Sequence, residues 1–406
     1  MALIPLEDAR AHVLDRCGVV APGAVPLAGA LGRVSAEVVV AGETVPPFDN
    51  SAMDGFAVRA ADTAGAPVVL DVVDTVAAGA SPTRPVGPGQ AVRIMTGAPL
   101  PEGADAVVMV ERTVARDGGR SVQIEVPVTS GTATRRAGDD VAAGDVVVGA
   151  GTVLRPGHLG VLASVGTAEV SVFPAPRVGV LSTGDELADA SAPLRPGQIR
   201  DSNRPTLCAL VAQAGFVAVD LGSVADDEAA LAEAFRTAAS DCDAVVTSGG
   251  VSMGDFDLVK VVLDRLGDMR WMQVAIKPAK PFAFGLVGGT PVFGLPGNPV
   301  SSMVSFELLA RPALRKMAGF PQAAWSRPVI VGVAGEALRR QPDGKVHFVR
   351  VVASVDDDGR HQVRSAGGQG SHQLSAMATA NALAVLADGD GVEAGAPVPV
   401  LLLDVG

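Results

Sequence analysis

The stretch RVGVLSTGDEL, residues 177–187, decides the fold of the largest part of the chain. Its first six residues form an apolar run bounded by turn residues, which indicates a buried parallel strand. Side chains at Ser202-Asn203 and at Asp226 are expected to cap later helices. The alternation of strand and helix predicts a doubly wound α/β domain over residues 177–325. Further strands are expected at residues 216–221, 243–247, 274–276 and 292–294, and further helices at residues 259–266 and 300–317.

Outside this domain the sequence is richer in strands. Short apolar runs between Gly, Pro and Asp turns predict an inserted β-rich module over residues 46–138. The flanking segments, residues 1–45 and 139–176, share a Gly-punctuated and Val-rich character, which predicts one discontinuous N-terminal domain. The tail, residues 326–406, predicts a small β-barrel or sandwich. The expected fold class is therefore a multidomain α/β plus β protein.

The composition excludes nucleic acid as a partner. Lys plus Arg number 32 against 44 Asp plus Glu, which gives a net charge of -12. Binding to phosphates needs a basic face, and base stacking needs aromatic side chains. Aromatic residues are only 3% of this chain and Tyr is absent. Hydrophobic residues are 48%, which is ample for packed cores.

Cysteine usage and hydropathy indicate a cytoplasmic protein. Cys17, Cys208 and Cys242 are odd in number and far apart, so we expect a reducing compartment and no disulfide framework. The acidic N-terminus does not resemble a signal peptide. Residues 281–306 carry no charge, but Gly and Pro interrupt them, so we expect buried strands and turns there and no membrane span.

Polar turns follow the predicted strands of the α/β domain. In open α/β sheets, ligands bind outside the carboxyl ends of the strands. Glycines allow backbone N–H groups to approach an anion, and Mg²⁺ bridges carboxylates to phosphate oxygens. The turns therefore predict a Mg²⁺-assisted phosphate site, whereas any single turn or charge taken alone is explained as structural. The groups that carry this prediction are Glu186, Asp255, Asp257, Lys277 and Lys280.

Three familiar sites are disfavoured. The chain has no G-x-G-x-x-G and no G-x-x-x-x-G-K-[ST], which argues against dinucleotide and P-loop sites. Residues 250–254, GVSMG, match the G-x-S-x-G pattern of esterases, but Ser248-Gly249 separates them from the strand. The 5 His form no H-x-x-x-H or H-x-H pair, so a zinc site is not expected.

Eight stretches, in this order along the chain, closely resemble the molybdopterin molybdenumtransferase family, and the C-terminal part of gephyrin is similar. The resemblance covers nearly the whole chain and is densest between residues 46 and 317. The stretches are PPFDNSAMDGFAV from residue 46, MTGAPLPEGADAVVMVE from 95, RRAGDD from 135, STGDEL from 182, IRDSN from 199, SGGVSMGDFD from 248, IKPAKP from 276 and GLPGNPVSS from 294.

The resemblance implies an enzyme that inserts molybdenum from molybdate into adenylyl-molybdopterin, releases AMP and uses Mg²⁺. It implies a homodimer and a C-terminal β-barrel, with molybdopterin adenylyltransferase and downstream molybdoenzymes as further candidate partners. By resemblance and by position, the expected catalytic residues are Asp54, Glu186, Asp257 and Lys277, with Glu186 and Asp257 as metal ligands. The expected substrate-binding residues are Thr96, Asp140, Asp226, Ser248, Gly249, Gly250, Lys280, Pro296, Gly297, Asn298, Arg350 and Ser371.

Three positions depart from the family pattern. Ala279 stands where the family usually has Gly, Gln273 where some members have a basic residue, and His372 where a small residue is commoner. These departures leave open a paralogue with an altered metal or reduced activity. Two alternatives stand beside the enzyme: a non-catalytic scaffold of the same fold, and a molybdopterin adenylyltransferase, whose fold is embedded in the chain. The full β-rich module and tail disfavour the second alternative, and the acidic residues disfavour the first.

Overall fold

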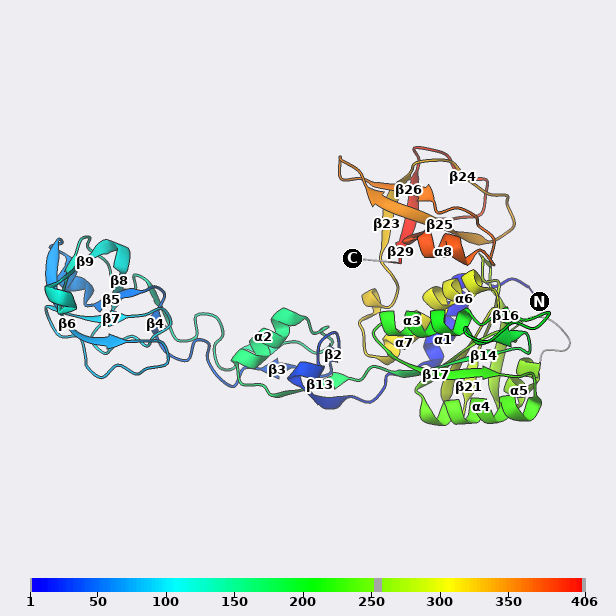
Figure 1. The fold of residues 1–406 in the computed structure, drawn as a ribbon, viewed down its shortest axis with the longest axis horizontal. Helices are drawn as coiled ribbons and strands as arrows, with labels where there is room; N and C mark the ends of the chain where they lie inside the picture. Colours follow the sequence, from blue (N-terminus) through cyan, green and yellow to red (C-terminus); the bar gives the residue numbers. More distant parts are fainter. Residues whose placement is uncertain (1, 252–257, 404–406) are drawn as a thin grey trace. The chain divides into compact units, whose positions relative to one another are not determined.

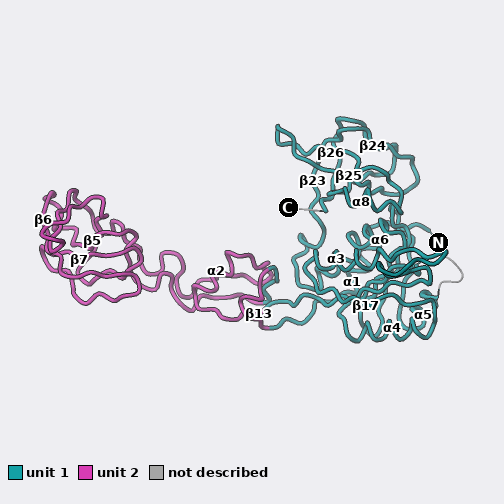
Figure 2. The backbone as a smooth tube through the Cα atoms, viewed as in Figure 1, with its two compact units in different colours: residues 1–23, 32–36, 172–406 teal, residues 24–31, 37–171 magenta. Residues whose placement is uncertain are grey.

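The computed structural model describes residues 2–251 and 258–403 (Figure 1). The chain divides into two compact units, which Figure 2 colours separately. Unit 1 comprises residues 1–23, 32–36 and 172–406, and unit 2 comprises residues 24–31 and 37–171. In the described part of the chain, no helix is long and apolar enough to cross a membrane.

The larger part of unit 1 is the predicted α/β domain. Its sheet has six strands in the order β17-β14-β18-β22-β21-β19. The first four strands are mutually parallel, and β21 is antiparallel to both β22 and β19. The carboxyl ends of β14, β17, β18, β19 and β22 therefore share one edge. The strands are β14 (Arg177–Thr183), β17 (Val217–Val224), β18 (Ala244–Ser248), β19 (Gly267–Gln273), β21 (Pro281–Val287) and β22 (Thr290–Leu295).

Helices cover both faces of this sheet, because neighbouring residues of each strand point to opposite sides. Val246 of β18 packs in one core with α1, α3, α6 and α7. Its neighbour Val245 packs in a second core with α4 and α5. The doubly wound arrangement is thus confirmed. The helices are α1 (Leu6–Arg16), α3 (Asn203–Gln213), α4 (Glu228–Asp241), α5 (Leu258–Leu266), α6 (Pro299–Ser305) and α7 (Arg311–Met317).

Two expectations for this domain need correction. The strand expected at residues 274–276 is not in the sheet, whose edge strand β19 ends at Gln273. Residues 267–273 form no apolar run, because residues 267–271 alternate between half-buried and exposed and only the last two are buried. The helix expected at residues 300–317 is interrupted by a π-turn at Phe306–Ala310, just before Pro312, whose nitrogen has no hydrogen to donate.

The C-terminal part of unit 1 is a closed five-stranded barrel, which decides between the expected barrel and sandwich. The ring runs β25-β26-β23-β29-β27 and returns to β25. A short strand from the α/β region, β20, pairs with β25 from outside the ring. The elements are β20 (Ile276–Lys277), β23 (Val329–Ala334), β24 (Leu338–Arg339), β25 (Val346–Val355), β26 (His361–Ser365), α8 (Leu374–Thr379), β27 (Ala382–Leu386), β28 (Gly391–Val392) and β29 (Pro397–Leu402).

Unit 2 contains the predicted β-rich module as a six-stranded sheet in the order β8-β5-β7-β6-β10-β9. Apolar residues on both faces of β5 are buried, Phe56 and Val58 on one side and Ala57 on the other. The elements are β3 (Val39–Val40), β4 (Asn50–Ser51), β5 (Gly55–Val58), β6 (Val68–Val76), β7 (Gln90–Ile94), β8 (Ala106–Met109), β9 (Thr113–Arg116), β10 (Ser121–Ile124), β11 (Thr134–Arg135), β12 (Val146–Val148) and α2 (Pro156–Ser164). The remaining short strands are β1 (Gly23–Pro26), β2 (Val34–Ser35), β13 (Glu169–Phe173), β15 (Leu187–Ala188) and β16 (Ile199–Arg200).

Candidate active site

A pocket of about 520 Å³ lies at the carboxyl edge of the α/β sheet, and we call it the edge pocket. The turns that follow β14, β17, β18 and β22 all contribute to its lining. The structure therefore brings seven of the expected site residues to one cavity. They are Glu186, Asp226, Gly249, Gly250, Pro296, Gly297 and Asn298.

Positive φ angles favour glycine in two of these turns, and at Gly250 the neighbouring Val259 also leaves no room for a side chain. At Gly184, φ is +139°, and a Cβ would lie 2.3 Å from the carboxylate Oε2 of Glu186. At Gly250, φ is +65°, and a Cβ would lie 2.3 Å from the Cβ of Val259. The first glycine lets Glu186 fold back over its own turn, and the second lets the turn after β18 pack against α5.

Asp226 is a pocket residue and not the helix cap that the sequence predicts. Asp227 is the N-cap of α4, and its side chain accepts a hydrogen bond from the backbone N–H of Ala230 at 2.8 Å. The backbone N–H of Asp226 donates to the Asp185 carboxylate at 3.0 Å. This arrangement leaves the exposed Asp226 side chain to line the edge pocket beside Glu186.

Asn203 is a site residue that the sequence analysis missed. Its side-chain amide donates to the hydroxyl of Ser248 at 2.7 Å and to the carbonyl of Gly297 at 2.6 Å. It therefore links the turn after β18 to the turn after β22. The predicted helix start is confirmed, because Ser202 is the N-cap residue of α3, but its side chain makes no cap hydrogen bond. The IRDSN stretch, which carries part of the family resemblance, was the available signal, but the sequence analysis names no site residue in it.

Lys277 belongs to a different cavity. It lies in β20, opposite His347 of β25, so both side chains project to the same side of the strands. Both residues line a pocket of about 570 Å³, the barrel pocket, together with Gln369. Burial, with the nearby charges of Arg340 and Lys277, lowers the pKa of His347, whereas its hydrogen bond to Asp343 acts in the opposite direction.

Lys277 and Lys280 are both exposed, and neither forms an ion pair with the described residues. Between them, Ala279 is 3% exposed and adopts a φ of +79°. That conformation favours glycine, which is the residue that the family pattern places there. The lysine loop therefore keeps its left-handed turn although the glycine has been replaced.

Arg350 is the largest side chain that is fully buried in the described chain, at 1% exposure. Its Nη2 donates to the carbonyls of Gly368 at 2.7 Å and Gly370 at 3.3 Å. Its Nε has no hydrogen-bond partner among the described residues. Burial lowers the pKa of Arg350. Beside this loop, the carbonyl of Ser371 accepts a hydrogen bond from the backbone N–H of Val300, at the start of α6.

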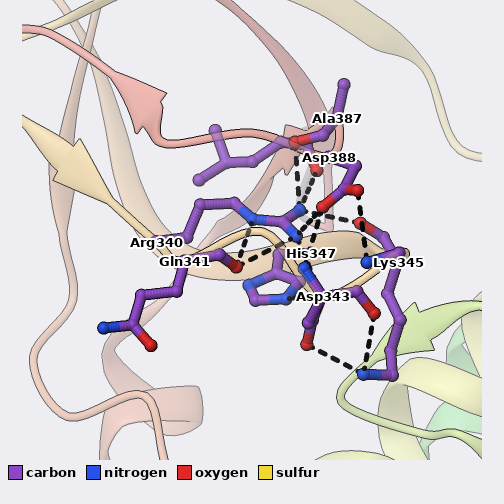
Figure 3. A network of polar contacts seen from close by, with 9 residues as sticks. Arg340, Gln341, Asp343, Lys345, His347, Ala387 and Asp388 are labelled. Carbon is purple, nitrogen blue, oxygen red and sulfur yellow. Dashed lines mark hydrogen bonds and ion pairs between the residues drawn. The ribbon is translucent and has the colours of Figure 1, made fainter.

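A second buried arginine of the barrel, Arg340, shows the opposite pattern (Figure 3). Its guanidinium contacts the carboxylates of Asp343 at 2.9 Å and Asp388 at 2.7 Å. It also donates to the carbonyls of Lys345, Leu386 and others. Hydrogen bonds from Lys345 and His347, with the former as the larger cause, lower the pKa of Asp343 to about 2.

Three expected site residues lie in unit 2. Asp54 accepts hydrogen bonds from the backbone N–H and from the hydroxyl of Thr96, both at 2.7 Å. These bonds, the backbone one first, lower the pKa of Asp54. Asp140 is exposed, and its backbone N–H donates to the carbonyl of Val45. The structure thus joins Asp54 to Thr96 across 42 positions of sequence.

The expected metal ligand Asp257 and its neighbour Asp255 lie outside the described residues. Within the described residues, no group of three or more His, Cys, Asp or Glu side chains is arranged to hold a metal ion. Glu186 and Asp226 do line one pocket. A pair of carboxylates fits Mg²⁺, which typically takes one or two carboxylates and completes its shell with water and substrate phosphate oxygens.

Three family descriptions match successive parts of the chain. Residues 4–166 match the MoeA N-terminal region (domain I and II). Residues 179–316 match the probable molybdopterin binding domain, and residues 333–403 match the MoeA C-terminal region (domain IV). The matched segments follow one another in chain order.

Curated relatives and a solved structure agree with these matches. The chain is 40% identical over 401 residues to a molybdopterin molybdenumtransferase of Haemophilus influenzae, covering 98% of each chain. It is 44% identical over 373 residues to molybdopterin molybdenumtransferase 2 of Mycobacterium tuberculosis, covering 89% of this chain and 90% of the other. A crystal structure of the molybdopterin biosynthesis MoeA protein from Pyrococcus horikosii superposes with a TM-score of 0.82 at 31% identity, covering 99% of this chain and 100% of that one. The chain therefore belongs to the molybdopterin molybdenumtransferase family.

Proposed function

We propose that this protein inserts molybdenum from molybdate into adenylyl-molybdopterin and releases AMP, as the last step of molybdenum cofactor biosynthesis. Family membership supports the transferase class. The observation that carries the proposal is the edge pocket, where glycine turns from three strands meet two carboxylates. Backbone N–H groups in such turns suit the phosphates of an adenylyl group. A cytoplasmic location also belongs to this proposal and rests on the family.

Glu186 lines the edge pocket and would hold Mg²⁺ there. The second ligand that the resemblance implies is Asp257, which lies outside the described residues. A bound Mg²⁺ supplies Lewis-acid polarisation of phosphoryl oxygens. The chain's own part is to orient the phosphates. The backbone N–H of Gly249 donates to the carbonyl of Leu295 at 3.2 Å, so the turn after β18 is proposed to offer the N–H of Gly250. Asn203 keeps this turn next to Gly297. Asp226 lines the same pocket and is proposed to bind substrate.

We assign molybdate recognition to Lys277, Lys280, Arg350 and Ser371. The support is the chemistry of these groups. The lysines form no ion pair with the described residues, and the buried Arg350 keeps an unpaired Nε. An arginine that is desolvated without a carboxylate partner suits an anion that the chain itself does not supply.

The functional form is proposed to be a homodimer. The candidate residues are divided between unit 1 and unit 2, and a second copy can supply Asp54, Thr96 and Asp140 to the edge pocket. The proposed four-part organisation has residues 1–45 and 139–176 as one discontinuous domain, residues 46–138 as its insertion, and domains over residues 177–325 and 326–406. Mixing Asp54→Ala and Glu186→Gln subunits should restore activity, because one of the two shared sites is then intact. A monomeric mass by light scattering, in a preparation that is fully active, would contradict the dimer.

The decisive assay measures AMP release from adenylyl-molybdopterin with molybdate and Mg²⁺. Glu186→Gln and Asp257→Asn should each abolish Mg²⁺-dependent release and leave the fold intact, because an amide is a far weaker Mg²⁺ ligand than a carboxylate. Glu233→Gln, at an exposed position of α4, is the charge-matched control and should keep full activity. Wild-type turnover in Glu186→Gln would refute the metal role. A folded wild type without any turnover would favour the scaffold alternative.

A further inference from the structure

The loop that carries Ser371 is built around Arg350. We call residues 366–373 the Ser371 loop; it connects β26 to α8. The Arg350 Nη2 donates to two of its carbonyls, those of Gly368 and Gly370. Carbonyl acceptors hold the guanidinium in place without neutralising its charge. The loop therefore fixes one end of the guanidinium, whereas the buried Nε has no hydrogen-bond partner among the described residues.

Gln369 fastens this loop to the strand of Arg350. Its side-chain oxygen accepts from the backbone N–H of Arg350 at 3.0 Å, and its side-chain nitrogen donates to the Arg350 carbonyl at 3.0 Å. The same nitrogen donates to the carbonyl of Gly367 at 3.0 Å. One amide thus pairs with both backbone groups of Arg350, as a neighbouring strand would, and closes the loop on itself.

The other end of the loop is held by the α/β domain. The backbone N–H of Val300 donates to the Ser371 carbonyl at 3.1 Å. Gln373 contributes a separate tie, because its side-chain oxygen accepts from the backbone N–H of Gly370 at 2.6 Å. Gln369 therefore fixes the loop to the barrel, and Val300 fixes it beside the start of α6, where Asn298 lines the edge pocket.

We propose that Gln369 is a positioning residue for the oxyanion site. It holds Arg350 and Ser371 in one fixed arrangement, and it lines the barrel pocket together with Lys277. This inference rests on the proposed function, because it takes Arg350 and Ser371 as groups that bind molybdate. Gln369 acts through these residues and does not itself perform the reaction.

The test compares two isosteric substitutions on the same loop. In Gln369→Glu the carboxylate still accepts from the Arg350 N–H but cannot donate to the two carbonyls or to the Ser365 hydroxyl, which the amide nitrogen meets at 3.3 Å. In Gln373→Glu the carboxylate keeps the only hydrogen bond that Gln373 makes through its side chain in the described structure. Both variants add one negative charge to the Ser371 loop, so the difference between them isolates the lost donor of Gln369.

We expect Gln369→Glu to weaken the binding of molybdate alone, measured by calorimetry on the full chain, by about tenfold relative to Gln373→Glu, as the loss of these hydrogen bonds implies. The KM for molybdate should rise by a similar factor, while kcat at saturating molybdate changes little. A residue that only stabilised the fold would lower the Tm without moving this KM. If Gln369→Glu does not fold, Gln369→Asn, which is too short to span both backbone groups, provides the same test.

The outcomes separate this inference from the proposed function. If Arg350→Ala binds molybdate as well as the wild type does, the oxyanion assignment itself is wrong, and the role of Gln369 is wrong with it. If Arg350→Ala loses molybdate but Gln369→Glu and Gln373→Glu bind it equally, the oxyanion site stands and the positioning role is overturned. If molybdate binding is weakened only in Arg350→Ala and Gln369→Glu, the result supports both the oxyanion site and the positioning role of Gln369.

Discussion

Arg340 and Arg350 are two buried arginines of one barrel, and they satisfy their donors in different ways. Arg340 has two carboxylate partners, Asp343 and Asp388, and a set of backbone carbonyls. Arg350 has two carbonyl partners and, among the described residues, no carboxylate. One guanidinium is neutralised within the chain, and the other keeps its charge and an unpaired Nε.

This difference supports the proposal that Arg340 is structural and that Arg350 binds an anion. Burying a charge is costly unless it is paired and hydrogen-bonded. In the Arg340 network, carboxylates and carbonyls of the chain itself offset the cost of burying the charge. The network therefore stabilises the barrel, and its guanidinium donors are already hydrogen-bonded. Around Arg350 the cost is only partly met, and an oxyanion would complete it. The free energy of unfolding should therefore respond to Arg340, and the affinity for molybdate to Arg350.

The largest expected effect is on stability. Arg340→Ala leaves Asp343 and Asp388 without their shared partner and several carbonyls without a donor. Arg340 is buried, but the side chains of Asp343 and Asp388 are 28% and 47% exposed. The loss should therefore lie near the lower end of the about 3–5 kcal/mol that breaking a fully buried pair costs in free energy of unfolding. Urea unfolding, monitored through the transition of the barrel, measures this loss of unfolding free energy. The comparison fails if this variant keeps the wild-type midpoint, or if Arg350→Ala destabilises the barrel equally.

The second effect is on affinity. Arg350→Ala removes a charge-assisted hydrogen bond to the proposed oxyanion, which is worth about 1.5–3 kcal/mol, or roughly tenfold to over a hundredfold in affinity for molybdate. The unfolding free energy should change less than in Arg340→Ala, because no carboxylate is left unpaired. Calorimetry with molybdate alone measures the affinity, and urea unfolding measures the unfolding free energy. Undiminished affinity in this variant would remove the distinction between the two arginines.

The turns of the edge pocket could be predicted from sequence because each follows an apolar strand. A buried strand leaves a local pattern, and the edge rule for α/β sheets then places Glu186, Gly249 and Gly297 together. The doubly wound domain follows from the same kind of pattern, whereas strand spacing in the tail predicts a barrel or a sandwich without deciding between them.

Contacts between distant segments left no such pattern. Gln369 meets Arg350 across 19 residues, and Asn203 meets Gly297 across 94 residues, through side-chain amides that no local period encodes. The edge strand β19 is partly exposed and polar, and Lys277 pairs with the barrel instead of ending a strand of the α/β sheet. In each case tertiary pairing set the position of the residue.

The third prediction concerns Lys277. Because its side chain is exposed, Lys277→Ala should weaken molybdate binding only about tenfold, near the lower end of what a charge-assisted hydrogen bond is worth. Lys277→Arg keeps the charge with a different geometry and should rescue part of the loss. Steady-state kinetics with molybdate varied distinguish the variants. An unchanged molybdate dependence in Lys277→Ala would make this lysine a surface charge without a role in anion binding.

The smallest effect is a pH dependence that belongs to the Arg340 network alone. Hydrogen bonds from Lys345 and His347 lower the pKa of Asp343 from 3.8 to about 2. A carboxyl group whose pKa is lower in the folded state stabilises the fold above its unfolded pKa, and this contribution is lost as the pH falls through the folded pKa. Between about pH 4 and pH 2, the wild type should therefore lose a stabilising contribution that Asp343→Asn lacks at every pH.

Urea unfolding of both proteins across that range measures the difference in unfolding free energy, which should be constant above about pH 5 and shrink towards pH 2. Asp358→Asn, at an exposed turn position before β26, corrects for the general titration of carboxyl groups. Arg350 has no carboxylate partner among the described residues, so its variants should leave this acid profile unchanged. A difference between wild type and Asp343→Asn that does not vary with pH would mean that the Asp343 carboxylate is not stabilised in its charged form. The Arg340 network would then be held by its carbonyl contacts and Asp388, and the contrast with Arg350 would rest on one carboxylate instead of two.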